Sequence, residues 1–322
     1  MEAIASSYVA VSDTSQLREL LDATNGSNEP CFILGGGSNV LFTQNIDALV
    51  IHNRMLGIEL VAEDDAHIWI KAGAGVAWHD LVMHCISNNW AGIENLALIP
   101  GSVGASPMQN IGAYGVEIKD VFDSLEAIHL KENALVTFDK EACSFGYRES
   151  VFKNKHKGDF IITSVTYRLN KQPDYHISYG AISAELERMG VSTLSIQAVA
   201  EAVMRIRRSK LPDPKIIGNA GSFFKNPELA TEQFKLLKSL YPEIVGYPVN
   251  EQMTKVAAGW LMESCGWKGY RRGDAGCHQQ QALVLVNYGL ATGNEVYQLS
   301  EDIMQSVEKK FGIRLEREVN VY

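Results

Sequence analysis

Apolar residues recur along the chain in two spacings that predict different elements. Apolar positions three and four residues apart predict helices over 13–26, 78–90, 195–208, 229–240, 252–266 and 294–312. Short apolar or alternating runs next to turn residues predict strands within 31–42, 47–53, 68–78, 160–169, 281–287 and 313–319. Helices and strands are therefore mixed without a regular repeat, which predicts an α+β fold.

Two prolines two residues apart in KLPDPK (210–215) interrupt the pattern after the 195–208 helix. A chain of 322 residues is long enough to form more than one domain. We therefore place a domain boundary here and predict one domain over 1–209, with subdomains of about 1–53 and 54–209. A second domain is predicted over 210–313, followed by a terminal strand over 314–322.

The charge balance limits the classes of partner. The chain has 29 Lys and Arg against 38 Asp and Glu, a formal net charge of −9. This excess of acidic residues disfavours nucleic acid and anionic membranes, although RIRRSKLPDPK (205–215) is locally basic. The first residues lack the basic and apolar pattern of a secretory signal, and no long apolar run follows. We expect a cytoplasmic protein with no membrane partner.

The cysteines and histidines predict neither a disulfide framework nor a metal site. Five cysteines are widely spaced and form no C-x-x-C pair. Of the eight histidines, the nearest pair, His79 and His84, has i,i+5 spacing, which does not place two ligands on one helix face.

Two segments are unusually poor in large side chains. GGGSN (35–39) follows an apolar run, and its glycines would let backbone N–H groups approach an anion such as a pyrophosphate. Val40 stands where the dinucleotide fingerprint requires its last glycine, so a Rossmann domain is not indicated. The second segment, IPGSVGASPMQNIGAYG (99–115), also implies close approach to the backbone. A Gly-rich turn and a packed loop remain the alternatives, but two such segments favour a large, phosphate-bearing ligand.

Three polar residues are candidates for chemistry. Ser222 stands on a Gly-rich turn in NAGSFFKNP (219–227), followed by two phenylalanines that could exclude water. Arg148 in SFGYRES (144–150) could meet a carboxylate through its planar guanidinium, or form a surface salt bridge. Glu318 lies on the polar face of IRLEREV (313–319), where a carboxylate is usually solvated.

The order of these motifs resembles the UDP-N-acetylenolpyruvoylglucosamine reductase family. The resemblance covers about residues 30–319, and GNAGSFFKNP and QNIGAYG carry most of its specificity. It implies an FAD-binding fold of the vanillyl-alcohol oxidase type in 1–209 and an α+β substrate-binding domain in 210–313. It also implies a cytoplasmic enzyme of peptidoglycan synthesis that uses NADPH to reduce UDP-N-acetylglucosamine enolpyruvate. We expect non-covalent FAD, a monomer and no metal.

The resemblance also implies a role for individual residues. Ser222 matches the family's proton donor, and Arg148 and Glu318 match its charged catalytic partners. The positions that match FAD contacts are Gly35, Gly36, Gly37, Ser38, Asn39, Ser102, Gly104, Asn110, Gly112 and Ala113. The positions that match substrate contacts are Tyr114, Tyr179, Lys210, Asn226, Lys268 and Gln281. Tyr179 in HISYGAI resembles the tyrosine of a loop found in one subclass.

The chain departs from the family pattern in two places. The usual Asn-Thr-Phe segment near the start is missing, and Asn320 stands where the family normally has arginine. Two other functions compete with the reductase: an oxidase on the same flavin fold, and a binding module for flavin or nucleotide sugar that has lost turnover. Some such oxidases attach flavin through a histidine at the glycine loop, where this chain has Ser38 and Asn39. The intact set of Arg148, Ser222 and Glu318 argues against the binding module.

Overall fold

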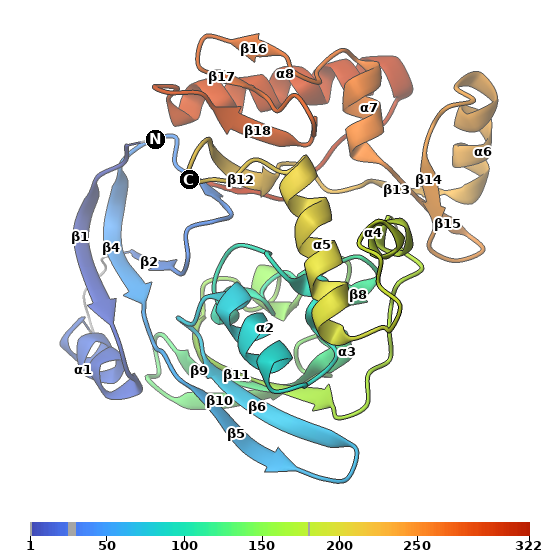
Figure 1. The fold of residues 1–322 in the computed structure, drawn as a ribbon. Helices are drawn as coiled ribbons and strands as arrows, with labels where there is room; N and C mark the ends of the chain where they lie inside the picture. The colour runs from blue at the N-terminus through green and yellow to red at the C-terminus, as the bar shows by residue number, and fades with distance from the viewer. Residues whose placement is uncertain (1, 25–29, 180) are drawn as a thin grey trace. The chain divides into compact units, whose positions relative to one another are not determined.

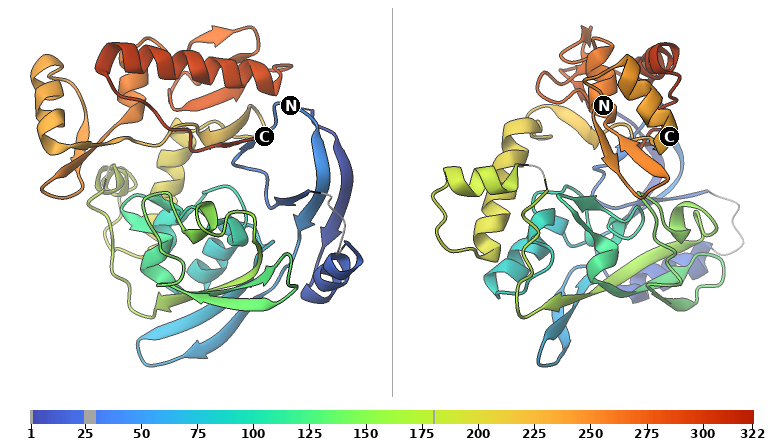
Figure 2. Two further views of the ribbon diagram at one scale, coloured as in Figure 1. Left: turned by 180° about the vertical axis from the view of Figure 1, so that it is seen from behind. Right: turned by 90° about the vertical axis from the view of Figure 1, so that its right-hand side faces the viewer.

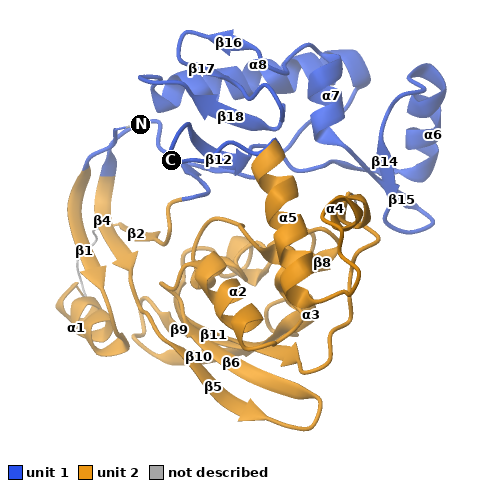
Figure 3. Ribbon diagram, in the orientation of Figure 1, with its two compact units in different colours: residues 1–4, 38–46, 210–322 blue, residues 5–37, 47–209 orange. Residues whose placement is uncertain are grey.

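The computed structural model describes residues 2–24, 30–179 and 181–322, and the chain divides into two compact units (Figure 3). Unit 1 consists of residues 1–4, 38–46 and 210–322, and unit 2 of residues 5–37 and 47–209. Unit 2 gives way to unit 1 between Ser209 and Lys210, at the start of the KLPDPK segment. Because residues 38–46 and 314–322 join 210–313 in one unit, the compact units are not continuous stretches of chain. The functional division made from the sequence stays a prediction.

Unit 2 contains a small sheet with the strand order β1, β4, β2. Its strands are β1 (Ala5–Val11), β4 (Ile46–Asn53) and β2 (Cys31–Leu34), and β2 runs parallel to β4. Helix α1 (Thr14–Thr24) packs Leu17 and Leu21 into the core beside this sheet. The 13–26 helix was thus predicted correctly as far as Thr24; residues 25 and 26 lie outside the described residues.

Unit 2 also contains a larger, five-stranded antiparallel sheet (Figure 1). Its order is β10 (Leu135–Asp139), β9 (Phe122–His129), β11 (Phe160–Asn170), β6 (His67–Gly73), β5 (Ile58–Glu63). In β6 every second residue is buried, as expected for a strand with one face on a core. Helices α2 (Trp78–Ser87) and α5 (Ile196–Lys210) share this core with the sheet (Figure 2). The other elements of unit 2 are β7 (Gly112–Ala113), β8 (Val116–Glu117), α3 (Ile118–Val121) and α4 (Ile182–Arg188).

Unit 1 is built on two small antiparallel sheets. The first has the order β12 (Gly218–Ser222), β18 (Val284–Asn287), β17 (Ala275–Cys277), β16 (Arg271–Arg272). The second has the order β13 (Glu228–Ala230), β15 (Met253–Val256), β14 (Gly246–Pro248) and lies next to α6 (Thr231–Leu240). Helices α7 (Ala258–Ser264) and α8 (Gly293–Phe311) share a core with the first sheet, and β3 (Val40–Leu41) pairs in parallel with β19 (Asn320–Val321).

Helix α8 has signals at both ends that make its position readable from the sequence. Thr292 and Glu295 form a reciprocal capping box at its start, and Gly312 ends it with a left-handed φ of 66°. The first helical residue, Gly293, lies so close to β3 that an added β-carbon would stand 1.7 Å from the Phe42 carbonyl oxygen. Only glycine fits there.

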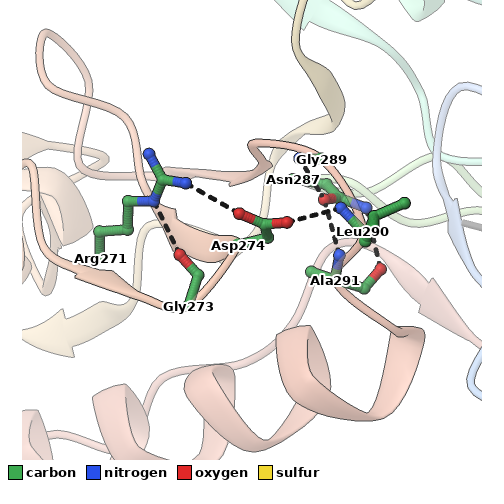
Figure 4. Close-up of polar contacts among 7 residues, drawn as sticks. All are labelled: Arg271, Gly273, Asp274, Asn287, Gly289, Leu290 and Ala291. Carbon is green, nitrogen blue, oxygen red and sulfur yellow. Dashed lines mark hydrogen bonds and ion pairs between the residues drawn. The ribbon is translucent and has the colours of Figure 1, made fainter.

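The loop before α8 is closed by a polar cluster that Figure 4 shows. The Asp274 carboxylate accepts hydrogen bonds from the Arg271 guanidinium and from the Leu290 N–H, both at 2.8 Å. Asn287 Oδ1 accepts from the N–H groups of Gly289 and Ala291, at 2.9 and 3.1 Å. These bonds join β16–β17 to the turn that leads into α8.

Two predicted elements were wrong in extent. Residues 252–266 were predicted as one helix, but the first part is β15, which pairs with both β13 and β14, and only Ala258–Ser264 is helical. Strand pairing on both sides outweighs the helical spacing there. Residues 313–319 were predicted as a strand, but this segment forms one isolated bridge, Phe224 to Arg317, and regular pairing begins at Asn320.

Candidate active site

The glycine loop packs directly against the second small-residue segment within unit 2. A β-carbon on Gly35 would stand 2.7 Å from Ser102 Oγ, and one on Gly36 would stand 3.1 Å from Gly101 Cα. Gly37 has a φ of +66°, which favours glycine. The two segments that are poor in large side chains, 35–39 and 99–115, therefore pack against each other through Gly35 and Gly36 on one side and Gly101 and Ser102 on the other. A narrow phosphate-bearing group fits this chemistry because no β-carbon blocks the amides.

Gly104 serves mainly to let backbones pack. Its N–H donates to the Ala74 carbonyl at 2.9 Å, and an added β-carbon would stand 2.6 Å from the Ala74 β-carbon. The neighbouring Val103 N–H donates to the Val76 carbonyl at 2.8 Å. The Gly104 amide is thus already used within the protein, whereas the Ser102 hydroxyl lies beside Gly35.

Asn110 braces the turn that carries Arg148. It is fully buried, its Nδ2 donates to the Gly146 carbonyl at 2.9 Å, and its Oδ1 accepts from the Lys119 N–H at 3.0 Å. Its side chain therefore joins protein segments, and its N–H donates to the Pro107 carbonyl at 3.4 Å.

Arg148 lies next to the same loop. Its Nη2 donates to the carbonyl of Gly112 at 2.7 Å, and Ser150 Oγ donates to the carbonyl of Met108 at 2.6 Å. Arg148 has a left-handed φ of 56°, which is uncommon for a residue with a long side chain. Strained backbone of this kind is often found at functional sites, where the surrounding bonds maintain it. The structure thus brings Arg148 to Gly112 and Ala113, which form β7.

Tyr114, the residue after Ala113, interacts electrostatically with Arg207 and Tyr179 of the same unit. Burial raises the pKa of the Tyr114 phenol, while Arg207 opposes this rise by its charge and a hydrogen bond, and Tyr179 adds to it. Arg207 Nε is buried and has no hydrogen-bond partner among the described residues. Burial also lowers the pKa of the Arg207 guanidinium. Sequence reasoning missed Arg207 because a basic helix end is ordinarily solvated.

Ser222 and Glu318 are brought together by backbone pairing within unit 1. The Phe223 N–H donates to the Leu283 carbonyl, and the Phe223 carbonyl accepts from the Glu318 N–H, both at 2.8 Å. Ser222 follows Gly221, which has a φ of 76°, and Phe223 is 2% exposed. Ser222 is therefore the last residue of β12, one residue before the backbone contact with Glu318.

Lys225 is a charged residue of this pair of segments that the sequence analysis did not select. It is 7% exposed, its N–H donates to the Glu316 carbonyl at 2.9 Å, and its Nζ lies 2.5 Å from Glu316 Oε1. In the sequence, only its position inside the GNAGSFFKNP motif could have indicated that Lys225 belongs to the site. The ion pair fixes the register of the chain two residues before Glu318.

Asn39 links the end of the glycine loop to the same segment. Its carbonyl accepts from the N–H and from the Nδ2 of Asn320, at 3.2 and 3.1 Å. Its Nδ2 donates to the carbonyl of Glu318 at 3.4 Å. Asn320, which stands where the family normally has arginine, therefore has a structural partner here. Ser38 is half-buried beside Asn39.

The remaining expected substrate positions are spread over several elements. Asn226 Oδ1 accepts from the Ala258 N–H at 2.9 Å at the start of α7, and Gln281 Oε1 would lie 3.3 Å from a β-carbon on Gly259 of the same helix. Lys268 pairs with Glu263 at 3.1 Å, and Lys210 ends α5 as an exposed residue. The structure thus brings Asn226 and Gln281 to one end of α7.

Two family models match the chain. The model described as "FAD binding domain" matches residues 5–137, and the one described as "UDP-N-acetylenolpyruvoylglucosamine reductase, C-terminal domain" matches residues 213–322. A UDP-N-acetylenolpyruvoylglucosamine reductase of Flavobacterium johnsoniae is 51% identical over 322 residues, 100% of this chain and 95% of that protein. The chain belongs to the UDP-N-acetylenolpyruvoylglucosamine reductase family. The reductase from Amoebophilus asiaticus is 50% identical, over 99% of this chain and 94% of that protein.

The fold agrees with this family. The structure of the reductase from Thermus caldophilus matches with a TM-score of 0.67 and 24% identity, over 98% of this chain and 91% of that one. The predicted family, the α+β class and the FAD-binding fold are confirmed. No helix in the described part of the chain is long and apolar enough to span a membrane. Within those same residues, no group of three or more His, Cys, Asp and Glu is placed to hold a metal ion.

Proposed function

We propose that this chain reduces UDP-N-acetylglucosamine enolpyruvate to UDP-N-acetylmuramate with NADPH and FAD, a step of peptidoglycan precursor synthesis. The observation that carries the proposal is the 51% identity to a reductase of the family over the full length of this chain. The family was predicted from motifs spread over about residues 30–319. One family model matches within the first half of the chain and the other within the second half. The oxidase alternative has no such support.

The bare backbone of residues 35–37 against Gly101 and Ser102 fits an FAD pyrophosphate, since a β-carbon on Gly35 or Gly36 would collide with its neighbours. When bound, FAD supplies the hydride transfer between NADPH and the substrate. Within unit 2, Gly35, Gly36, Gly37 and Ser102 would hold it, and Gly112 and Ala113 would form the adjoining wall, which the buried Asn110 supports from within the protein. Gly104 contributes by close packing, and Ser38 and Asn39 continue the loop.

The reaction needs a proton donor and charge stabilisation from the protein. Hydride addition at C3 of the enolpyruvyl ether leaves negative charge at C2 and on the adjoining carboxylate, and protonation of C2 completes the product. Ser222, the last residue of β12, gives that proton, since it matches the family's proton donor. Arg148 stabilises the enolate, and Glu318, when protonated, donates a hydrogen bond to the enolate or to the adjoining carboxylate.

The finer assignments rest on the same resemblance. Tyr114, Tyr179, Lys210, Asn226, Lys268 and Gln281 bind the substrate. The protein acts as a cytoplasmic monomer that uses NADPH, and it has no membrane or nucleic-acid partner. The net charge of −9 supports the last point.

One assay tests the proposal. Purified protein reconstituted with FAD is mixed with NADPH, and absorbance is followed with and without UDP-N-acetylglucosamine enolpyruvate. NADPH consumption that requires this substrate and yields a product two mass units heavier supports the reductase. Consumption that requires oxygen alone supports the oxidase, and bound flavin without turnover supports the binding module.

A further inference from the structure

Asn95 joins two segments that are far apart in the sequence. It is 1% exposed, and its Nδ2 donates to the carbonyl of Tyr114 at 2.9 Å and to that of His176 at 2.7 Å. An amide nitrogen carries two hydrogens, so both are used, one on each segment. Since Asn95 stands in a short 3-10 helix, Glu94–Leu96, its own backbone is fixed.

The two segments also touch near their tyrosines. A β-carbon on Gly115 would stand 3.3 Å from the Tyr179 β-carbon, and Gly115 has a φ of +85°. Tyr179 also raises the pKa of the half-buried Tyr114 phenol, although less than burial itself does. Tyr179 is 49% exposed and therefore available to a ligand.

The segment that carries Tyr179 is held to unit 2 by other contacts as well, because Tyr175 and Ile177 pack against the hydrophobic core. Residues 173–179 form no helix or strand. The Tyr175 hydroxyl donates to the Leu194 carbonyl at 3.2 Å and Ser183 Oγ donates to the Ile177 carbonyl at 2.9 Å, and both bonds are exposed. The bond from Asn95 is partly buried. It adds a hydrogen bond at His176, between the two residues of the segment that pack against the core.

We propose that Asn95 is a positioning residue that holds the Tyr114 and Tyr179 segments together and so sets the affinity for the nucleotide-sugar substrate. The inference rests on the proposed function, which assigns both tyrosines to substrate binding. A segment that is already ordered binds without the cost of ordering it, and the apparent dissociation constant rises in inverse proportion to the fraction of molecules in the competent arrangement. The two hydrogens of the Asn95 amide go to Tyr114 and His176, not to the glycine loop or Arg148, so we expect hydride entry from NADPH not to depend on Asn95.

Asn95→Asp tests this with little change of shape. A carboxylate cannot donate to the two carbonyls, so the segments separate. The substrate Kd, read from the flavin spectrum, is expected to rise about tenfold or more, as it would if one molecule in ten kept the competent arrangement. The rate of flavin reduction by NADPH is expected to stay unchanged.

Asn53→Asp is the matched control. Asn53 is a buried amide of the same unit, 7% exposed, whose Nδ2 donates to the Ile162 carbonyl at 2.8 Å. It is expected to lower the melting temperature without changing the substrate Kd. If both variants changed melting temperature and Kd in the same proportion, Asn95 would have a general structural role and the proposal would be overturned.

A double-mutant cycle with Tyr179→Ala decides whether the effect passes through that segment. Asn95→Asp is expected to add little to the Kd of Tyr179→Ala protein, whereas additive effects contradict the proposal. If Asn95→Asp protein does not fold, Gly115→Ala takes its place in the cycle, because its β-carbon presses on Tyr179. An unchanged Kd in that variant also contradicts the proposal.

Hydrogen exchange separates this inference from the proposed function. Amides of residues 175–179 are expected to exchange faster in Asn95→Asp protein than in Asn53→Asp protein, with no substrate present. Equal exchange rates in the two variants would show that Asn95 does not restrain this segment and would overturn the proposal. Wild-type protein that neither binds nor reduces the substrate overturns the proposed function, whatever the exchange result.

Discussion

The packing of the glycine loop against Gly101 and Ser102 predicts different outcomes for two neighbouring substitutions. In Gly36→Ala, the new β-carbon would stand 3.1 Å from Gly101 Cα and 3.2 Å from Gly101 C. Carbon atoms prefer separations of about 3.5–4.0 Å, so one backbone must move by roughly 0.4–0.9 Å. The Gly101 segment resists this, because its carbonyl accepts from the Trp78 N–H at 2.9 Å.

Overpacking of this kind costs about 1–3 kcal/mol, which corresponds to a rise of about 5- to 150-fold in the FAD dissociation constant if the bound state carries the strain. In Gly35→Ala the close contact, at 2.7 Å, is with Ser102 Oγ, and the next atom, Ser102 Cβ, is at an ordinary 3.9 Å. Removing the hydroxyl relieves that contact. FAD binding by Gly35→Ala/Ser102→Ala is therefore expected to match that of Ser102→Ala alone, whereas Ser102→Ala cannot restore Gly36→Ala.

The assay is titration of each apoprotein with FAD, followed by flavin fluorescence or calorimetry, together with thermal unfolding with and without FAD. Gly190→Ala is the control, because Gly190 has a φ of +69° and nothing within 4 Å of an added β-carbon. It is expected to lose stability from backbone strain and to bind FAD normally. If Gly36→Ala bound FAD as tightly as wild type, the assignment of the FAD site to residues 35–37 packed against Gly101 and Ser102 would be refuted. Rescue of Gly36→Ala by Ser102→Ala would refute it as well.

Three further predictions concern unit 1. Ser222→Ala is expected to leave flavin reduction by NADPH near normal and to slow reoxidation by substrate by ~10² or more in stopped-flow traces; equal slowing of both steps would indicate a packing defect. Glu318→Gln is expected to lower kcat by ~10² or more with little change in substrate Kd. Glu316→Gln is the control: because Glu316 forms an ion pair with buried Lys225, this variant is expected to lower the melting temperature and not kcat. Near-wild-type turnover in both variants would remove Glu318 from the catalytic set. Hydrogen bonds from the Leu290 N–H and Arg271 lower the pKa of Asp274 below 3.8, so its bonds stabilise the fold above that pH and this contribution is lost as pH falls through the lowered pKa. Asp274→Asn is therefore expected to melt below wild type at pH 7, with a difference that shrinks in acid; a constant difference would contradict this.

Local patterns were enough for the elements whose stabilising contacts are close in sequence. Helix α8 has its apolar stripe, its Thr292–Glu295 capping box and its Gly312 end within one stretch of chain. Strand β11 likewise follows from its own apolar residues. The motifs themselves were sufficient to name the family and the candidate residues, because a motif is a local string. The three glycines at 35, 36 and 37 indicated a backbone that other groups can approach closely, although the sequence did not show that Gly101 and Ser102 pack against it.

Only the tertiary structure decided which distant residues meet. The bond from Asn39 to Glu318 spans 279 residues and that from Asn95 to His176 spans 81, and neither leaves a periodic signal in the chain. Residues 253–256 have helical spacing, yet they form β15 because partners on both sides satisfy their backbone groups. A buried amide or lysine is stable only where such partners exist, so the roles of Asn95 and Lys225 depend on neighbours that the sequence does not specify locally.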